Sequence, residues 1–181
     1  MVRDCIRGNA GAQYRLYNTY AGYMMALCSR YTKCRADAED ILQEGFVKVF
    51  KNIDKYKGDG SLGAWIRKIM INTAIDYLKK NNKYQVSLFY PENEVMHPVS
   101  NDNPGVNIAA EELTKMIMQL PEGYQLIFNL YAVDGYSHAE IGKMLGIQEV
   151  TSRSQYARAR KLLISWLRKT EEEIKAEKYG Q

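Results

Sequence analysis

Residues 81–107 interrupt the helical pattern of this chain more sharply than any other stretch. They contain three of its four prolines and six asparagines, and no periodicity is sustained through them. Because a structureless stretch of this length is uncommon inside a compact domain, it predicts a flexible linker between two small domains. We place these domains at 1–80 and 109–181, with the linker over 81–108.

Helical periodicity fills the N-terminal side, and no alternating β-branched run of strand length occurs anywhere in the sequence, which predicts an all-α chain. We expect helices over 9–30, 36–53 and 62–80, with the glycine-containing break YKGDGS at 56–61 before the last one. Their expected inward residues are Leu16, Tyr20, Tyr23, Met24 and Leu27 in the first helix, Ile41, Leu42, Phe46, Val49, Phe50 and Ile53 in the second, and Leu62, Trp65, Ile66, Ile69, Ile75 and Leu78 in the third.

On the C-terminal side, helices are expected over 109–119 and from Pro121 to about residue 133, and residues 137–163 carry the sharpest local signal. Ser137 followed by Glu140 is the pattern of a capping box at a helix start. Gly146 stands where a left-handed residue ends that helix, and Thr151 can begin the next. Helix, glycine turn and helix at this spacing predict a helix-turn-helix, whose second helix lies in the major groove of DNA.

The second of these helices has a basic outward face. No acidic residue occurs between Glu149 and Glu171, whereas six cations do. If Tyr156, Ala159, Leu163 and Trp166 form the buried face, the helical repeat turns Ser154, Ala157 and Lys161 outward, flanked by Arg153 and Arg158. Such a surface suits a polyanion, so we expect DNA to lie against it. A solvated basic face on an ordinary helical hairpin is the alternative.

Catalysis and metal binding have little support in the sequence. The chain has two histidines, His97 and His138, and no glycine-rich phosphate loop or nucleophile elbow, so we expect neither an enzyme nor a cofactor. An odd number of cysteines without a CxxC pair predicts reduced thiols, mostly buried, and no metal site; the three are Cys5, Cys28 and Cys34. No apolar signal core or membrane-spanning stretch is seen, so we expect a cytoplasmic protein without membrane insertion.

Two long segments resemble the extracytoplasmic-function (ECF) sigma factors of bacterial RNA polymerase. Residues 37–80, DAEDILQEGFVKVFKNIDKYKGDGSLGAWIRKIMINTAIDYLKK, resemble family regions two-point-one to two-point-four, within region 2. Residues 120–163, LPEGYQLIFNLYAVDGYSHAEIGKMLGIQEVTSRSQYARARKLL, are similar to region 4. Both occur in the family order and cover nearly the whole chain. The resemblance implies a protein of region 2 plus region 4 that directs core polymerase to specific promoters and helps to melt them.

The resemblance also implies two surfaces on the N-terminal half. The helix that begins DAEDILQEGF matches the segment that docks on the coiled coil of the polymerase β′ subunit, with the β subunit as a further partner; its residues are Asp37, Asp40, Gln43, Glu44 and Lys48. The following loop and helix match the element that captures a flipped minus-ten base and tracks the strand; these residues are Tyr56, Lys57, Gly58, Asp59, Gly60 and Ser61, with Arg67, Lys68, Asn72, Asp76 and Lys80. For Trp65 a core role is favoured. The acids near residue 37 could instead serve only the helix dipole.

In region 4 the resemblance implies recognition of the minus-thirty-five element. Arg153, Ser154 and Arg158 match base-facing positions, with Ala157 and Lys161 on the same face, and Thr151, Gln155 and Arg160 match phosphate-facing ones. Ser137 and His138 could touch phosphate, although His138 is equally consistent with a residue of the helix cap. The sequence departs from the common family pattern at 150–152 and at Gln155, so base preferences of other members are not carried over.

The expected partners are core RNA polymerase, promoter DNA and an anti-sigma factor. The nearest alternative is a transcriptional regulator that binds DNA alone through the same helix-turn-helix. Such proteins usually dimerise, and no sustained heptad offers a dimer seam here, so we expect a monomer. An interaction module that acts on other regulators is a third possibility, which the basic second helix disfavours.

Overall fold

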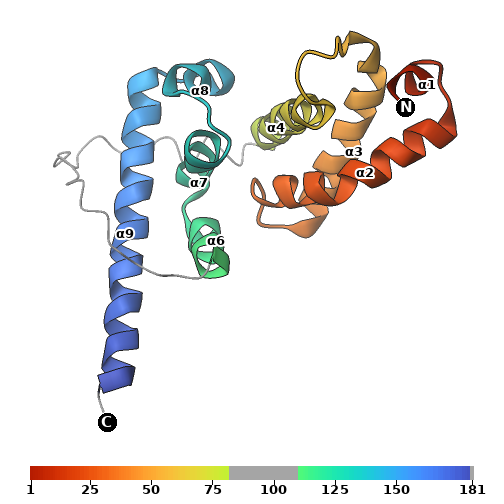
Figure 1. The fold of residues 1–181 in the computed structure, drawn as a ribbon. Helices are drawn as coiled ribbons and strands as arrows, with labels where there is room; N and C mark the ends of the chain where they lie inside the picture. The colour runs from red at the N-terminus through yellow and green to blue at the C-terminus, as the bar shows by residue number, and fades with distance from the viewer. Residues whose placement is uncertain (82–109, 180–181) are drawn as a thin grey trace. The chain divides into compact units, whose positions relative to one another are not determined.

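The computed structural model describes residues 1–81 and 110–179, and it divides the chain into two units, Met1–Asn81 and Asn82–Gln181. Every regular element in these described ranges is helical (Figure 1). The prediction of an all-α chain with two helical domains is therefore confirmed. The linker predicted over 81–108 lies, apart from Asn81, outside the described residues.

The first unit packs three long helices around one apolar core. The elements are α1 (Val2–Ile6), α2 (Ala10–Ser29), α3 (Arg35–Lys51), the short 3-10 helix η1 (Ile53–Lys55) and α4 (Leu62–Lys80). Each long helix contributes completely buried side chains, among them Leu16, Met24, Ile41, Ile66 and Met70. The periodicity predicted α2 and α3 to within a residue or two, and α4 with both ends correct.

Two features of this unit differ from the sequence expectation. Helix α1 was not predicted, because five residues are too few to show a helical period, and its contribution to the core is Cys5, 3% exposed. Tyr23 was expected inside but is 61% exposed, since Met24 and Leu27 already define the buried stripe of α2. Tyr23 is therefore available on the surface of the unit.

The second unit contains a helix-turn-helix whose second helix is the long helix α9 (Glu149–Tyr179). The elements before it are α6 (Ala110–Gln119), α7 (Glu122–Phe128), the π-helical turn η2 (Asn129–Val133) and α8 (His138–Leu145). Pro121 caps α7, one residue before the position expected of it. The core around α9 consists of Leu120, Ala159 and Leu163, against which Met116, Ile117, Tyr124, Phe128, Leu162 and Trp166 pack.

The turn between α8 and α9 has the geometry that its sequence predicts. Ser137 and Glu140 form the complete capping box, and Gly146 adopts a left-handed conformation with φ 72°. The N–H groups of Gly146 and Ile147 both donate to the Gly142 carbonyl, at 2.9 and 3.0 Å. A Cβ on Gly142 would lie 2.8 Å from the Ile147 carbonyl oxygen, so glycine is needed for this close turn. Helix α9 begins at Glu149, two residues before the predicted Thr151.

Candidate nucleic-acid interface

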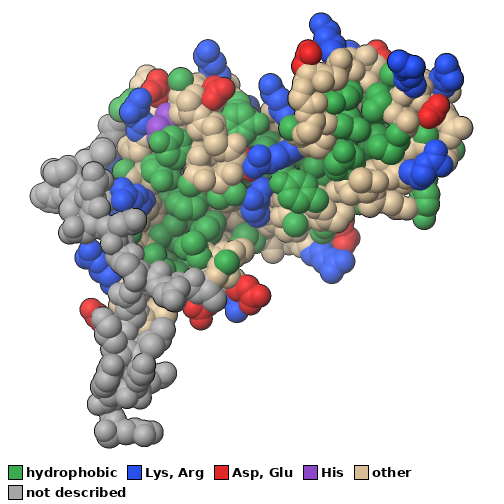
Figure 2. Space-filling view, viewed as in Figure 1, with side chains coloured by type: hydrophobic (Ala, Val, Ile, Leu, Met, Phe, Trp, Pro, Cys, Tyr) green, Lys and Arg blue, Asp and Glu red, His purple; other side chains and the backbone are tan. Residues whose placement is uncertain are grey.

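Helix α9 turns one face inward and presents cations on the other. Ala159 and Leu163 are buried, as predicted, whereas Tyr156 and Trp166 are half-buried at the edge of that face. On the outward side Arg153 and Lys161 are exposed, and the half-buried residues are Thr151, Ser154, Ala157, Arg158 and Arg160. Basic side chains lie beside the histidine at the α8 end of this unit (Figure 2). The outward face therefore carries positive charge at the start of the second helix of the helix-turn-helix.

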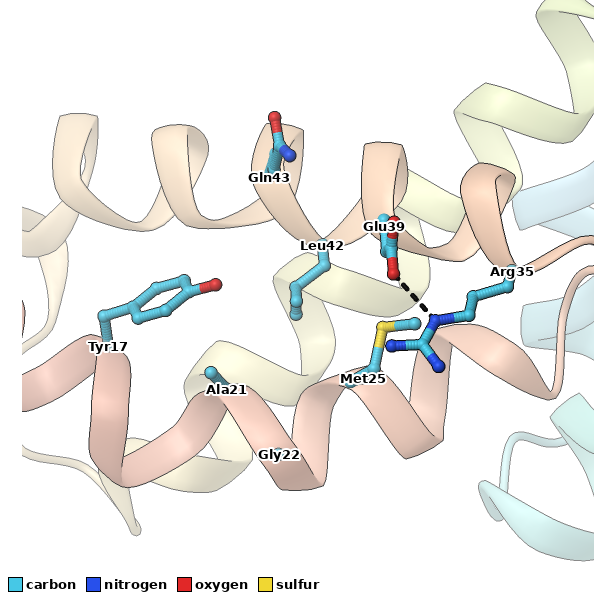
Figure 3. Close-up of a pocket in the computed structure, with 8 residues that line it drawn as sticks. All are labelled: Tyr17, Ala21, Gly22, Met25, Arg35, Glu39, Leu42 and Gln43. Atoms are coloured by element: carbon cyan, nitrogen blue, oxygen red, sulfur yellow. Dashed lines mark hydrogen bonds and ion pairs between the residues drawn. The ribbon is translucent and has the colours of Figure 1, made fainter.

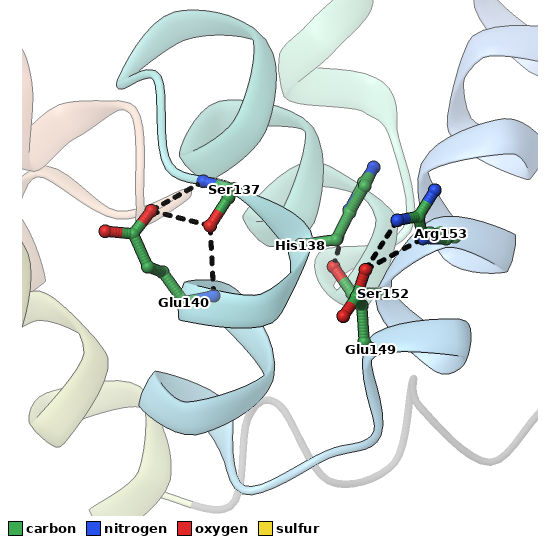
Figure 4. Close-up of polar contacts among 6 residues, drawn as sticks. All are labelled: Ser137, His138, Glu140, Glu149, Ser152 and Arg153. Atoms are coloured by element: carbon green, nitrogen blue, oxygen red, sulfur yellow. Dashed lines mark hydrogen bonds and ion pairs between the residues drawn. The ribbon is translucent and has the colours of Figure 1, made fainter.

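Arg153 is held by a carboxylate of its own helix. Its Nε and Nη2 atoms lie 3.1 and 2.5 Å from Glu149 Oε1, and 64% of the Arg153 side chain is exposed (Figure 4). An exposed pair one helical turn apart is worth only about 0.3–0.5 kcal/mol. Glu149 therefore orients the guanidinium at little cost to its release toward a nucleic acid.

The structure corrects the assignment of Gln155 as a phosphate-facing residue. Gln155 is 3% exposed and Ser152 is fully buried, so both side chains point into the unit. The buried face of α9 is centred on Ser152, Gln155, Ala159 and Leu163, which are spaced three and four residues apart. Sequence reasoning missed this because polar residues at two of these positions broke the apolar stripe.

His138 joins the two helices of the helix-turn-helix. Its Nδ1 lies 2.9 Å from Ser152 Oγ on α9 (Figure 4). Its ring stacks on Tyr131 with a centroid distance of 4.1 Å and an angle of 8°. Tyr156 lies against both rings, with centroids 5.7 Å from His138 and 4.5 Å from Tyr131. His138, the first residue of α8, thus joins the helix start to α9 and to η2 through these contacts. Ser137 is exposed, but its hydroxyl already donates to Glu140 Oε2 at 2.7 Å.

This junction makes the stability of the second unit depend on pH. Burial lowers the pKa of His138 from its ordinary value, the nearby Arg153 cation lowers it further, and Glu149 partly opposes the shift. The unfolded chain takes up a proton near pH 6.5, whereas the folded unit resists it. The contribution of neutral His138 to stability is thus fully present above about pH 6.5 and is lost as pH falls through the folded pKa.

We expect the wild-type chain to lose more stability between pH 7.5 and 5.5 than a His138→Phe variant, which keeps an aromatic ring but cannot titrate. Urea denaturation followed by the fluorescence of Trp166, in a Trp65→Phe background, measures this difference. Carboxylates titrate in both chains and cancel in the comparison. Parallel pH profiles for the two chains would show that His138 is not the titrating group.

The loop between η1 and α4 is a closed turn that starts a helix. The Tyr56 hydroxyl donates to the Gly60 carbonyl at 2.8 Å, and the Tyr56 ring lies 5.7 Å from that of Trp65. Gly58 and Gly60 have φ values of 87° and 84°, and the Ser61 hydroxyl accepts from the Ala64 N–H at the start of α4. Trp65 is half-buried rather than a core residue, because it supports this loop. Lys57 and Asp59 are exposed at the tip.

Helix α4 carries the polar stripe that follows this loop. Its members are all exposed, and they are Lys68, Asn72, Asp76 and Lys80, while Arg67 is half-buried beside them. Asp76 does not stand alone, because its Oδ2 lies 3.2 Å from Lys48 Nζ on α3. Lys48 also lies 3.0 Å from Glu44 Oε1. Burial alone would lower the pKa of the Lys48 ammonium, but its bonds to Glu44 and Asp76 raise it.

The acidic residues of α3 differ in their exposure. Asp40, Gln43 and Glu44 are exposed, as expected of a docking surface. Asp37, in contrast, is half-buried. Its Oδ1 accepts a hydrogen bond from the Tyr77 hydroxyl of α4 at 2.8 Å. Its assignment as an exposed carboxylate therefore needs correction.

A groove of about 390 Å³ runs beside these acids, between α2 and α3. Gln43 and the ion pair of Arg35 with Glu39, 2.8 Å apart, line its α3 side (Figure 3). Tyr17 and Met25 are among the residues that α2 contributes. No local pattern predicts this groove, since its two walls belong to different helices, α2 and α3. It places an apolar hollow next to exposed polar side chains.

A second hollow, of about 460 Å³, lies between α2 and the start of α4. It is lined by Thr19, Tyr20, Tyr23, Ser61, Gly63, Ala64 and Arg67. Tyr20 and Tyr23 were expected in the core, so the α2 side of this hollow was not predicted. The sequence did contain a signal: Leu16, Met24 and Leu27 already supply the buried stripe of α2, which leaves Tyr23 for the surface.

Other kinds of site find no support among the residues that the structure describes. Within 1–81 and 110–179 no three histidine, cysteine or acidic side chains gather as a metal site. Cys5 and Cys28 are buried and Cys34 is exposed, and all three are free. None of the described helices is long and apolar enough to span a membrane.

Comparison with known proteins matches both units. The pattern of sigma-70 region 2 matches residues 16–84, and that of sigma-70 region 4 matches residues 110–163, so together they cover more than half of the chain. The ECF RNA polymerase sigma-E factor of Escherichia coli (strain K12) is 28% identical over 173 residues, which is 90% of this chain and 90% of that protein. The sigma-E factor of Haemophilus influenzae is 24% identical over 178 residues, with 90% and 91% covered.

A solved structure agrees with these matches in fold. The sigma factor RpoE of Bartonella quintana, crystallised with the anti-sigma factor NepR, matches with a TM-score of 0.52 and 20% identity. The match covers 86% of this chain and 96% of that one. With region 2 and region 4 in order along the chain and sigma-E factors similar over most of its length, this chain belongs to the sigma-70 family of RNA polymerase sigma factors, in its extracytoplasmic-function group.

Proposed function

We propose that this ECF sigma factor, which directs RNA polymerase to promoters, divides the work between its two units: the first binds core polymerase and the melted minus-ten strand, and the second reads the minus-thirty-five duplex. The observation that carries the proposal is the outward face of α9. There Arg153 stands exposed near the start of the second helix of a capped helix-turn-helix, and Lys161 is exposed further along the same helix. A helix so placed presents its N-terminal residues to base edges.

For the minus-thirty-five element, Arg153 and Arg158 are the proposed base-reading residues. Arginine pairs bidentately with guanine O6 and N7, and the small Ala157 between them permits close approach or contact with a thymine methyl. Ser154 is proposed to face the bases with them and Lys161 to lie on the same face, and Thr151 and Arg160 are proposed to hold phosphates. His138 acts indirectly in this proposal, by joining α8 to α9 through Ser152.

For the minus-ten element, the loop at 56–61 is proposed to receive an unstacked base. Extraction of a base from the duplex costs a few kcal/mol, so the receiving loop must be preformed. The bond from Tyr56 to the Gly60 carbonyl and the cap at Ser61 support this role, because they hold the loop in one shape. Lys57 and the α4 stripe, with Arg67, are proposed to track the strand from which that base comes.

For core polymerase, Asp40, Gln43 and Glu44 are the proposed contacts, on an exposed face of α3 beside the apolar groove. Carboxylates there suit a basic partner helix, which we take to be the β′ coiled coil, with the β subunit as a further contact. The RpoE protein that shares this fold was crystallised with an anti-sigma factor, and we propose such a partner here too. We further propose that the free protein is monomeric and cytoplasmic and that it has no enzymatic activity.

The free-standing regulator is the alternative to be excluded. Two measurements distinguish a sigma factor from such a regulator. Sedimentation of the free protein reports its oligomeric state, and titration with purified core polymerase reports its affinity for core. A monomer that binds core tightly, and that binds promoter DNA specifically only in that complex, supports the proposed function. A stable dimer that ignores core and binds a two-fold symmetric DNA site would overturn it.

A further inference from the structure

Lys48 links the two helices of the first unit that carry different proposed functions. Its ammonium lies 3.0 Å from Glu44 Oε1, on the same helix, and 3.2 Å from Asp76 Oδ2 on α4. The Lys48 side chain is 35% exposed, against 64% for Asp76. The lysine therefore lies partly under the surface and the carboxylate outside it.

Asp76 is the one acid in a stripe otherwise suited to a polyanion. Lys68, Asn72 and Lys80 occupy the same exposed side of α4 at intervals of four residues. An unpaired carboxylate there would repel the phosphates of a DNA strand laid along the helix, because both groups are negatively charged. This repulsion would weaken the binding of the strand. The ion pair with Lys48 offsets that charge.

Lys48 contributes little to folding by this contact. A half-exposed ion pair adds little to stability, and α3 and α4 are also joined by the bond from the Tyr77 hydroxyl to Asp37 and by their buried cores. The helices therefore keep their positions without it. What the lysine changes is the charge that the α4 stripe presents.

We propose that Lys48 is a positioning residue for strand binding rather than a contact to core polymerase: it holds and neutralises the Asp76 carboxylate so that the α4 stripe can lie along the promoter strand. This inference rests on the proposed function of α4. It reassigns Lys48 from the polymerase surface, where the family resemblance placed it, to the nucleic-acid surface.

The test uses holoenzyme made with full-length variants and a fluorescent single-stranded oligonucleotide carrying the minus-ten non-template strand of a promoter that the holoenzyme transcribes. Lys48→Met should weaken strand binding roughly two- to tenfold and flatten its dependence on salt. Asp76→Asn should bind at least as tightly as the wild type. The double variant should match Asp76→Asn, because without the Asp76 carboxylate the α4 stripe carries no negative charge for Lys48 to offset.

Lys51→Met is the matched control, since Lys51 is an exposed lysine on the same helix and its loss changes net charge equally. Equal weakening by Lys48→Met and Lys51→Met would reduce the effect to net charge and overturn the inference. It also fails if the double variant stays as weak as Lys48→Met, or if Lys48→Met lowers the affinity for core. Wild-type holoenzyme that transcribes but does not hold the strand would instead refute the proposed function of α4.

Discussion

Reversal of two charges on α3, Asp40→Lys with Glu44→Lys, is expected to abolish binding to core polymerase while both units stay folded. Both side chains are exposed, and only Glu44 has an ion-pair partner described for it, Lys48 at 3.0 Å. The reversal places positive charge on α3 against the basic surface proposed for the polymerase. Such a like-charge contact costs several kcal/mol of binding free energy. We therefore expect the affinity for core to fall on the order of 10²- to 10³-fold or more.

The matched control reverses Glu111 and Glu112 on α6 to lysine. These two exposed acids lie in the second unit, and their reversal changes the net charge by the same amount. Titration of fluorescent variants with core polymerase measures the affinity, and circular dichroism checks that helix content is kept. If the α3 variant still binds core as the control does, the polymerase surface lies elsewhere.

The other large effect is expected from Arg153→Ala combined with Arg158→Ala. Each lost bidentate contact to a base costs about 1–3 kcal/mol, or roughly 5- to 150-fold in affinity. Arg153 must also leave Glu149 to reach DNA, and that exchange costs little because the pair is exposed. The double variant should therefore lose recognition of the minus-thirty-five element and keep its affinity for core.

We would measure promoter binding by holoenzyme with the natural minus-thirty-five element and with that element scrambled. The difference separates sequence-specific recognition from non-specific electrostatic attraction to DNA. Lys115→Ala, which removes one exposed cation from α6, is the control. The arginine variant should bind both DNAs equally, whereas wild type and control should prefer the natural one. A retained preference in the arginine variant would remove these residues from base reading.

The sequence predicted α2, α3 and α4 well because each carries a long apolar period, whereas the five residues of α1 are too few to show one. Capping boxes and turn glycines are local, so Ser137 with Glu140, and Gly146, could be read directly from the chain. The family resemblance supplied the proposed roles of the surface residues, which no periodicity contains.

What could not be predicted depends on contacts between helices. The bond from Tyr77 to Asp37 spans forty residues and that from Lys48 to Asp76 spans twenty-eight, and no local pattern reports either. The family resemblance placed Gln155 toward phosphate, whereas the structure buries it beneath α9. For His138 the sequence left a phosphate contact and a helix-cap residue both open, because its stack on Tyr131 and its bond to Ser152 join it to residues seven and fourteen positions away.

Run-off transcription tests the central claim most directly. Purified core bacterial RNA polymerase and this protein are incubated with genomic fragments of its own organism, including the one upstream of its own gene. The account predicts discrete transcripts that require the protein, start at mapped promoters and disappear with the α3 charge reversal. Absence of any start with every fragment, while the protein alone still shifts duplex DNA, would contradict it and favour a free-standing regulator.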